Sequence, residues 1–372
     1  MKRIALLGIL LLGFSSTFKA RETSEIKLPK PSGIYPVGTV IYHWTDLSRD
    51  DIVSEIPDDK RQLLVQIWYP AELVKDKSTA PYMPEMSVLR STFKQGADRL
   101  EQIGTNSSLN AFFSRAKVKF PLIIFSPGTG TPRSWYTMLM EELASQGYVV
   151  AAIDHPYMGL VAIGSKIVKP FAAWTEPPPG GLANKTDEER DKYWSRSNEQ
   201  LSADQRFVLS QIEQLNRKDP DKRFNKRLDL KRVGMIGHSQ GFISRTCGQD
   251  LRFKACINLD GVPELAERRN GIAQPFMTMR DGDDSPRATT IYDNLRNVAY
   301  DVVIRGAGHN SYLDLPLLAG YKYKIDAARS HQIINAFMLG FFDKYLQNKV
   351  SHQLENISTE FPEVKFTAYK AK

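Results

Sequence analysis

The sequence predicts an α/β fold in which helices flank a mostly parallel central sheet, and three observations lead to this prediction. Short apolar runs rich in β-branched and aromatic residues recur along the chain, separated by longer amphipathic or polar stretches. From Phe120 onward these runs alternate with segments of helical periodicity, which is typical of βαβ units. The chain has 372 residues, 42% of them hydrophobic, so it can bury a large core without a metal or disulfide.

The individual elements follow from this pattern. The apolar runs predict strands at residues 40–44, 63–69, 120–125, 149–154, 233–237, 255–260, 275–279 and 300–304. Helical periodicity predicts helices at residues 135–145, 204–216, 239–247 and 326–348. No helix separates the first two strands, so we expect them to form an antiparallel start to the same sheet.

Two segments interrupt the alternation. Residues 78–117 form a long connection, and residues 165–200 contain a Pro-Pro-Pro-Gly-Gly run followed by a charged stretch. Loops of this length in a compact domain are typically lids, binding loops or disordered insertions. We therefore expect residues 21–372 to form one domain, with both segments inserted over the C-terminal ends of the strands.

The N-terminus has the parts of a secretory signal peptide. Lys2 and Arg3 precede an apolar run at residues 4–14, and small polar residues follow it. This run is shorter than the ~18–20 residues that a membrane span needs, which disfavours the alternative of an uncleaved anchor. We expect residues 1–20 to be a signal peptide, with its cleavage site left open, and the mature protein to be periplasmic or secreted.

Composition and charge narrow the range of partners. The net charge of +8 is modest, and its basic residues form no stripe interleaved with aromatic residues. We therefore expect no nucleic-acid partner. Nothing in the composition indicates an obligate protein partner.

The two cysteines, Cys247 and Cys256, flank the end of a predicted helix and the start of the next strand. Export would allow a disulfide between them. Two buried free thiols are equally compatible with the pattern, so both alternatives stay open.

The motif Gly-His-Ser-Gln-Gly at residues 237–241 carries the strongest chemical signal. It follows a predicted strand and opens a helical stretch. In a nucleophile elbow the serine lies on a strained strand-to-helix turn, where side chains in place of the two glycines would collide. The alternative is a glycine-rich turn with an incidental serine, but the strand-before, helix-after context favours Ser239 as a nucleophile.

A serine hydroxyl needs a general base, and His309 has the position of one. It follows the last predicted strand, precedes the last helix and has glycines on its N-terminal side. In the chain order Ser–Asp–His, this is where the base of a hydrolase belongs. By contrast, His155 lies upstream of the serine; the alternative for His309 is an ordinary surface histidine.

The base needs an orienting carboxylate, and two places compete for this role. Asp260 ends the strand that follows the nucleophile helix, whereas Asp281, Asp283 and Asp284 follow the next strand. The second group also has the composition of an ordinary polar turn. Spacing alone does not decide between the two places.

An oxyanion hole requires two backbone N–H groups. One is expected from Gln240, the residue after the nucleophile. The other is expected from the Gly/Pro loop after the strand at 120–125, where Thr129 is the best candidate. A plain turn is the alternative interpretation of this loop.

With these residues assembled, the sequence resembles the platelet-activating-factor acetylhydrolase family, secreted-type serine esterases of the α/β-hydrolase fold. The resemblance covers most of the mature chain and is carried by residues 28–39, 65–70, 125–130, 237–241, 259–260 and 308–309. It implies that Asp260 is the acid, that Thr129 and Gln240 supply the oxyanion donors, and that neither a cofactor nor a metal takes part.

Two departures from the family pattern concern the pocket. Pro127-Gly128 stands where the family usually has His-Gly, and Phe242 stands where the elbow usually continues with a second glycine. Both changes affect the pocket more than the Ser–His–Asp residues.

The resulting prediction is an exported serine ester hydrolase with Ser239, His309 and Asp260 as its catalytic residues. Its expected substrates are short-acyl esters, including phospholipids with an acetyl or oxidised sn-2 chain, which implies transient contact with a lipid surface. The alternatives are a general carboxylesterase or polyester hydrolase, and a catalytically inactive α/β-hydrolase used for binding.

Overall fold

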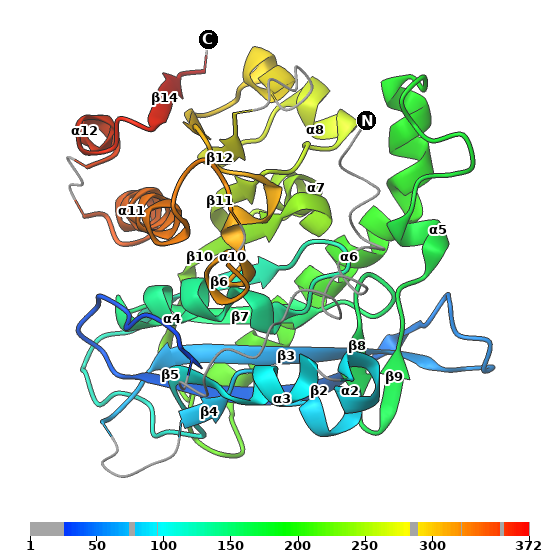
Figure 1. Ribbon diagram of the computed structural model, residues 1–372, viewed down its shortest axis with the longest axis vertical. Coiled ribbons are helices and arrows are strands. Elements are labelled where there is room, and N and C mark those ends of the chain that lie inside the picture. Colours follow the sequence, from blue (N-terminus) through cyan, green and yellow to red (C-terminus); the bar gives the residue numbers. More distant parts are fainter. Residues whose placement is uncertain are drawn as a thin grey trace.

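A single large sheet runs through the chain (Figure 1). The computed structural model describes residues 26–73, 79–94, 96–282, 289–320, 322–349 and 353–371. The sheet has 12 strands in the order β1-β5-β2-β3-β7-β6-β10-β11-β12-β13-β14, with β4 beside β5. Figure 1 shows the long β2–β3 hairpin in blue toward one end of the sheet and β14 in red at the other end.

The strands of this sheet are β1 (Ile26–Lys27), β2 (Val37–Asp50), β3 (Lys60–Pro70), β4 (Thr79–Pro81), β5 (Ile103–Leu109), β6 (Phe120–Ser126), β7 (Val149–Asp154), β10 (Leu228–His238), β11 (Phe253–Leu259), β12 (Phe276–Asp281), β13 (Ala299–Ile304) and β14 (Val364–Tyr369). A separate two-stranded hairpin consists of β8 (Val161–Ile163) and β9 (Lys166–Val168). All eight predicted strands are confirmed.

The direction of the strands decides where a site can form. From β7 to β13 each neighbouring pair is parallel, so the carboxyl ends of these six strands meet at one edge of the sheet. The β2–β3 and β3–β7 pairs are antiparallel, as expected for the start of the sheet. In sheets of this kind, ligands bind outside the carboxyl ends of the strands.

Helices cover both faces of the sheet. They are α2 (Met86–Phe93), α3 (Gly96–Glu101), α4 (Thr137–Ser145), α5 (Ala172–Thr175), α6 (Asp187–Arg217), α7 (Ile243–Gln249), α8 (Leu265–Asn270), α10 (Leu315–Leu318), α11 (Ala327–Leu346) and α12 (Gln353–Glu360). Short 3-10 turns are η1 (Arg133–Tyr136), η2 (Ser239–Gly241), η3 (Thr290–Asn294) and η4 (His309–Tyr312).

Alternate residues of the central strands point into two different cores. In β6, Ile123 and Phe125 pack with residues of α4 and α11, whereas Leu122 and Ile124 pack with residues of α6 and α7. Strands buried on both faces are apolar at every position, which explains why β6 and its neighbours are visible in the sequence as continuous apolar runs.

Helix α6 is longer than predicted. It starts at Asp187 rather than at residue 204, so the charged stretch expected in a loop is its first turns. Thr186 and Glu189 form a reciprocal capping box, and Arg268 of α8 pairs with Asp187 at 2.8 Å. Acidic residues and a capping box favour a helix N-terminus, and this local signal fixes the true boundary.

Strands β5 and β14, toward the two ends of the sheet, are among the strands absent from the sequence-based prediction. Strand β5 lies within residues 78–117 and pairs with β2, so this part of the expected insertion extends the sheet. Its sequence is mostly polar and has no apolar run. Strand β14 belongs to the basic C-terminal tail and pairs with β13, where Phe366 stacks on Tyr300 with 5.7 Å between the ring centroids.

Cys247 of α7 and Cys256 of β11 form a disulfide, which is one of the two alternatives that the sequence leaves open. The expected signal peptide at residues 1–20 lies outside the described residues. Among the helices of the described part of the chain, none is both long enough and apolar enough to span a bilayer.

Candidate active site

The turn after β10 has the geometry of a nucleophile elbow. The φ angle of Ser239 is +54°, in the left-handed region that residues with a side chain rarely adopt. A Cβ atom at Gly237 would lie 2.5 Å from a methyl carbon of Ile243, and one at Gly241 would lie 2.7 Å from the carbonyl oxygen of Ser126. Both glycines of the motif are therefore required by close packing around the turn.

Three side chains that are far apart in the sequence meet at the carboxyl edge of the parallel strands. Nε2 of His309 lies 2.8 Å from Oγ of Ser239, and its Nδ1 lies 2.5 Å from Oδ2 of Asp260. Ser239 follows β10, Asp260 follows β11 and His309 follows β13. The His309 side chain is 39% exposed and that of Asp260 is 8% exposed, so solvent reaches the imidazole while the carboxylate is shielded. We call these three residues the elbow set.

The competing carboxylates occupy other positions. Asp281 ends β12, and its backbone N–H donates a hydrogen bond to the carboxylate of Asp260 at 3.3 Å. Asp281 thus supports Asp260 through its main chain. Asp283 and Asp284 lie outside the described residues. The contact of the imidazole Nδ1 is with Asp260.

The loop after β6 lies over the serine. A Cβ atom at Gly128 would lie 3.3 Å from Cβ of Ser239, so a glycine lets the backbone approach Ser239 closely. The Thr129 hydroxyl donates to the side-chain carbonyl of Gln240, which ties this loop to the elbow. Among the described residues, neither the Thr129 nor the Gln240 backbone N–H is in a hydrogen bond, so both are free to donate to a substrate oxygen.

A sequence profile of the family described as platelet-activating factor acetylhydrolase, isoform II, matches residues 20–363. The chain belongs to this family. The match confirms the expected family across most of the chain.

Individual relatives agree with this assignment. The platelet-activating factor acetylhydrolase of Cavia porcellus is 28% identical over 61% of this chain and 58% of its own length. A probable 1-alkyl-2-acetylglycerophosphocholine esterase of Arthroderma benhamiae is 25% identical over 92% of this chain and 94% of its own.

The solved structures include a ferulic acid esterase from Streptomyces cinnamoneus, which superposes with a TM-score of 0.76 at 26% identity. The superposition covers 92% of this chain and 100% of that one. The fold is therefore the α/β-hydrolase fold, as predicted. Together with the family, this neighbour shows that the chain is a carboxylic ester hydrolase.

Phe242, one of the two departures from the usual pattern of the acetylhydrolase family, lies beside the site. Its backbone is left-handed, with φ +40° and ψ 60°. Its half-buried ring packs against a small apolar cluster of Met158, Trp174 and Leu201. These residues come from the loop after β7 and from α5 and α6. The ring therefore faces the second of the two expected insertions, residues 165–200, and not the two large helix–sheet cores.

A second Ser–His–Asp arrangement lies beneath the elbow. Nε2 of His155 is 3.1 Å from Oγ of Ser126, and its Nδ1 is 2.9 Å from Oδ2 of Asp204. Gln205 donates to Oγ of Ser126 and also to the carbonyl of Gly241, both at 2.9 Å. We call Ser126, His155 and Asp204 the buried set.

The charge of the buried set is compensated inside the protein. The side chains of His155 and Asp204 are 1% and 0% exposed. Arg61 contacts Oδ2 of Asp204 at 2.7 Å, and Arg49 contacts Oδ1 at 2.8 Å. Burial by itself would raise the pKa of Asp204, but Arg61 and His155 outweigh it and hold this pKa far below its ordinary value. The sequence gives no signal for these contacts, because they join a helix to two separate strand ends.

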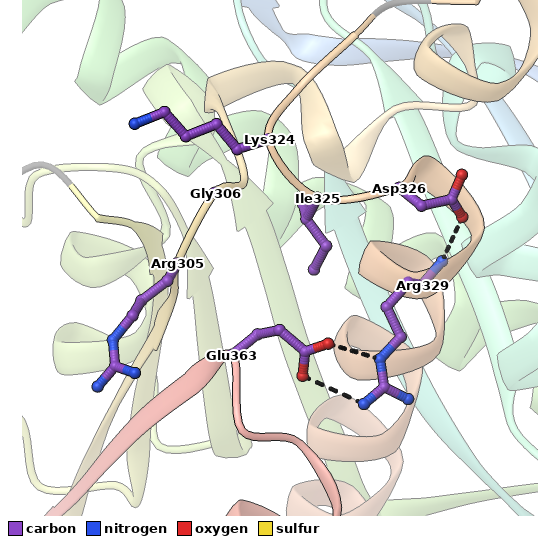
Figure 2. Close-up of a pocket in the computed structure, with 7 residues that line it drawn as sticks. All are labelled: Arg305, Gly306, Lys324, Ile325, Asp326, Arg329 and Glu363. Carbon is purple, nitrogen blue, oxygen red and sulfur yellow. Dashed lines mark hydrogen bonds and ion pairs between the residues drawn. The ribbon is translucent and has the colours of Figure 1, made fainter.

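The loop that leads to His309 borders a surface pocket (Figure 2) of about 490 Å³. Arg329 and Glu363 form a two-bonded ion pair across it, at 2.9 and 3.1 Å, and the Ile325 N–H donates to the carbonyl of Gly306 at 3.2 Å. The described residues that line it include no serine, cysteine or histidine. These contacts hold the His309 loop from outside. In the described ranges, no cluster of His, Cys, Asp and Glu side chains could hold a metal ion.

Proposed function

We propose that this member of the acetylhydrolase family is an exported serine esterase in which Ser239 forms an acyl-enzyme. The observation that carries the proposal is the hydrogen-bonded chain from Ser239 through His309 to Asp260, set beside the free N–H groups of Thr129 and Gln240. These are the parts that acyl transfer requires: a nucleophile, a base, an orienting acid and an oxyanion hole.

Each group has one task in the proposed mechanism. Oγ of Ser239 attacks the ester carbonyl while Nε2 of His309 takes its proton. Asp260 accepts the hydrogen bond from Nδ1–H, which keeps Nε2 unprotonated before the attack and stabilises the imidazolium formed afterwards. The N–H groups of Thr129 and Gln240 stabilise the negative oxygen of the tetrahedral intermediate.

The two half-reactions then use the same groups in turn. His309 gives its proton to the departing alcohol oxygen as the C–O bond breaks, which leaves the acyl group on Ser239. A water molecule attacks this ester, again with His309 as the base, and releases the carboxylic acid. Together the two half-reactions convert ester and water into alcohol and carboxylic acid, with no change of oxidation state.

The proposed substrates are short-acyl esters, among them phospholipids with an acetyl or oxidised sn-2 chain. The names of the relatives support this class. So does Phe242, because it directly follows the elbow turn and its ring packs against the cluster of Met158, Trp174 and Leu201. Each methylene of the acyl chain that finds no apolar site forfeits ~0.8 kcal/mol, or about fourfold.

Export is part of the proposal. It is supported by the charged start and the apolar run of residues 2–14, and by the disulfide between Cys247 and Cys256, which persists in oxidising compartments. Full-length expression followed by N-terminal sequencing of the periplasmic or secreted fraction tests it. A mature chain that begins near residue 16 or 21 is expected, whereas an uncleaved cytosolic chain would contradict export.

One observation favours a second candidate, an esterase for aromatic acyl groups. One similar solved structure is a ferulic acid esterase, and the superposition covers 92% of this chain. In this candidate function an aromatic acyl group stacks on the half-buried ring of Phe242. Parallel assays on methyl ferulate and on an acetylated glycerophosphocholine separate the two candidates.

Nitrophenyl esters of increasing acyl length test the short-chain proposal. We expect kcat/KM to fall steeply from acetate or butyrate toward decanoate, and Phe242→Gly to flatten this decline. Glycine suits the left-handed backbone at this position, so the substitution isolates the effect of the ring. Phe112→Ala, at a side chain 78% exposed, is the control that leaves the profile unchanged. A wild-type preference for decanoate or longer, above its micellar threshold, would contradict the proposal.

A further inference from the structure

A buried chain of hydrogen bonds links the loop after β6 to the backbone of His309. This loop contains Gly128 and Thr129, and we call it the oxyanion loop. Gly128 N–H donates to the hydroxyl of Tyr136 at 3.0 Å, and this hydroxyl lies 2.7 Å from Nδ1 of His238. Nε2 of His238 lies 2.9 Å from the carbonyl oxygen of His309. Tyr136 is 0% and His238 is 1% exposed, so water does not replace these partners.

Elementary hydrogen-bonding rules place the protons along this chain. The carbonyl of His309 can only accept, so Nε2 of His238 must carry a hydrogen. Burial first, and then the neighbouring His309, lower the pKa of His238 well below its ordinary value, so the ring is neutral and its Nδ1 is an acceptor. Burial raises the pKa of Tyr136, so its hydroxyl stays protonated and donates a hydrogen bond to Nδ1 of His238.

We propose that His238 and Tyr136 are positioning residues that fix the backbone of His309 relative to the oxyanion loop. The inference rests on the proposed function, since it assigns the two residues a part in aligning its base with its oxyanion donors. The motif places His238 next to the nucleophile, so the same residue that precedes Ser239 holds the loop carrying its base.

Neutrality of His238 is required by the chemistry at its neighbour. The rings of His238 and His309 have centroids 4.8 Å apart. During each half-reaction His309 becomes a cation, and a second positive charge at this distance would oppose that step. The Tyr136 hydroxyl satisfies the acceptor nitrogen of His238 without charging the ring.

Three substitutions test the chain. His238→Gln keeps an N–H donor at the place of Nε2, whereas His238→Asn has a polar atom only at the place of Nδ1. Tyr136→Phe removes the hydroxyl that fixes the tautomer. Tyr312→Phe is the matched control, because its ring lies 5.4 Å from that of His238 while its buried hydroxyl has no hydrogen-bond partner in the described part of the chain.

We expect His238→Asn and Tyr136→Phe to lower kcat about tenfold with KM unchanged, because alignment acts on the transition state. His238→Gln should retain kcat within about threefold and Tyr312→Phe within about twofold of the wild type. ¹⁵N spectra of histidine-labelled wild-type protein should show His238 as the neutral Nε2–H tautomer at about pH 6.5, the ordinary pKa of histidine, where a free histidine is half protonated.

The inference would be overturned if Tyr136→Phe matched Tyr312→Phe, if His238→Gln were no better than His238→Asn, or if the losses appeared in KM. Tyr136→Phe changes only one hydroxyl, so it keeps the test valid even if a His238 variant fails to fold. A wild-type enzyme whose Ser239 reacts with a serine-directed probe, combined with unaffected variants, would refute this inference and leave the proposed function intact.

Discussion

The described part of the chain contains two Ser–His–Asp arrangements, and we propose that one of them, the elbow set, is catalytic while the other is structural. The elbow set has hydrogen-bond distances of 2.8 and 2.5 Å, and the buried set has distances of 3.1 and 2.9 Å. Residue types and order of contact are the same in both. Their surroundings differ, and it is the surroundings that separate a nucleophile from a structural hydrogen bond.

The two sets differ first in the solvent exposure of the histidine and in the backbone conformation at the serine. The imidazole of His309 is 39% exposed, whereas that of His155 is 1% exposed. Ser239 lies on a strained turn with free N–H groups beside it, whereas Ser126 is the last residue of a regular strand. No substrate carbonyl can reach Oγ of Ser126.

The two sets differ second in the charged partners of the aspartate. Two arginines neutralise Asp204 within the protein, whereas Asp260 accepts from the backbone of Asp281 and faces His309. An acid neutralised by fixed cations stabilises the fold. An acid whose main charged partner is a histidine stabilises the imidazolium as it forms.

The largest expected contrast is between the two serines. Ser239→Ala should lower turnover by several orders of magnitude, on the order of 10⁶-fold, and Ser239→Ala/His309→Ala should be little worse, because these residues act as a unit. Ser126→Ala should cost less than about tenfold, since it removes only buried hydrogen bonds. Steady-state kinetics on nitrophenyl acetate measure both; equal losses would erase the distinction between the sets.

The next contrast concerns the acid. Asp260→Asn should lower turnover by ~10⁴-fold, because the imidazole then adopts the wrong tautomer. Asp281→Asn should change it little, since Asp281 contributes its backbone N–H to Asp260. The reverse pattern would move the acid to β12, and small effects of Asp283→Asn and Asp284→Asn complete the comparison.

The buried set should instead determine stability. Asp204→Asn should lower the free energy of unfolding by about 3–5 kcal/mol, because Arg61 would keep a buried charge without its main partner. Denaturant unfolding measures this, and turnover of the fraction that remains folded should stay within about tenfold of the wild type. A stable but inactive variant would contradict the structural role.

The pH dependence of stability should also differ between the wild type and Asp204→Asn. Because the pKa of Asp204 is lowered in the folded state, its stabilisation is complete above the unfolded value of ~3.9 and is lost as the pH falls below it. Wild-type stability should therefore drop more steeply below about pH 4 than that of Asp204→Asn. Parallel slopes for the two proteins would exclude this assignment.

The smallest expected effect on kcat comes from the contact between the side chains of Thr129 and Gln240, the two residues whose N–H groups we propose as oxyanion donors. Thr129→Val removes the hydrogen bond to the Gln240 side chain and leaves both backbone N–H groups in place. We expect a loss of about three- to tenfold in kcat, as for one neutral hydrogen bond. A loss above about 10²-fold would mean that the Thr129 hydroxyl itself contacts the reacting oxygen.

The elbow set could be predicted because each member belongs to a local pattern. Ser239 lies in a five-residue motif between a strand and a helix, and His309 follows the last apolar run and three of its four preceding neighbours are small. Asp260 needed the family resemblance, since two strand ends offered carboxylates. Parallel strands bring their carboxyl ends together, so these local patterns meet in space.

The buried set could not be predicted, because its members have no common local pattern. His155 lies in a loop after β7, Asp204 on the buried side of α6, and Arg61 on an antiparallel strand. Their pairing depends on how α6 packs on the sheet, which is a tertiary property. Strand β5 escaped prediction for a related reason: its polar sequence is held by pairing with its neighbours rather than by apolar burial.

Covalent labelling tests most directly the claim that surroundings and not residue types select the nucleophile. A fluorophosphonate probe followed by proteolysis and mass spectrometry reports which serine reacts. We predict a single adduct on Ser239 that is lost in Ser239→Ala and forms much more slowly in His309→Ala, with Ser126 unmodified in the active protein. An adduct on another serine, or an esterase that turns over substrate while Ser239 stays unlabelled, would contradict it.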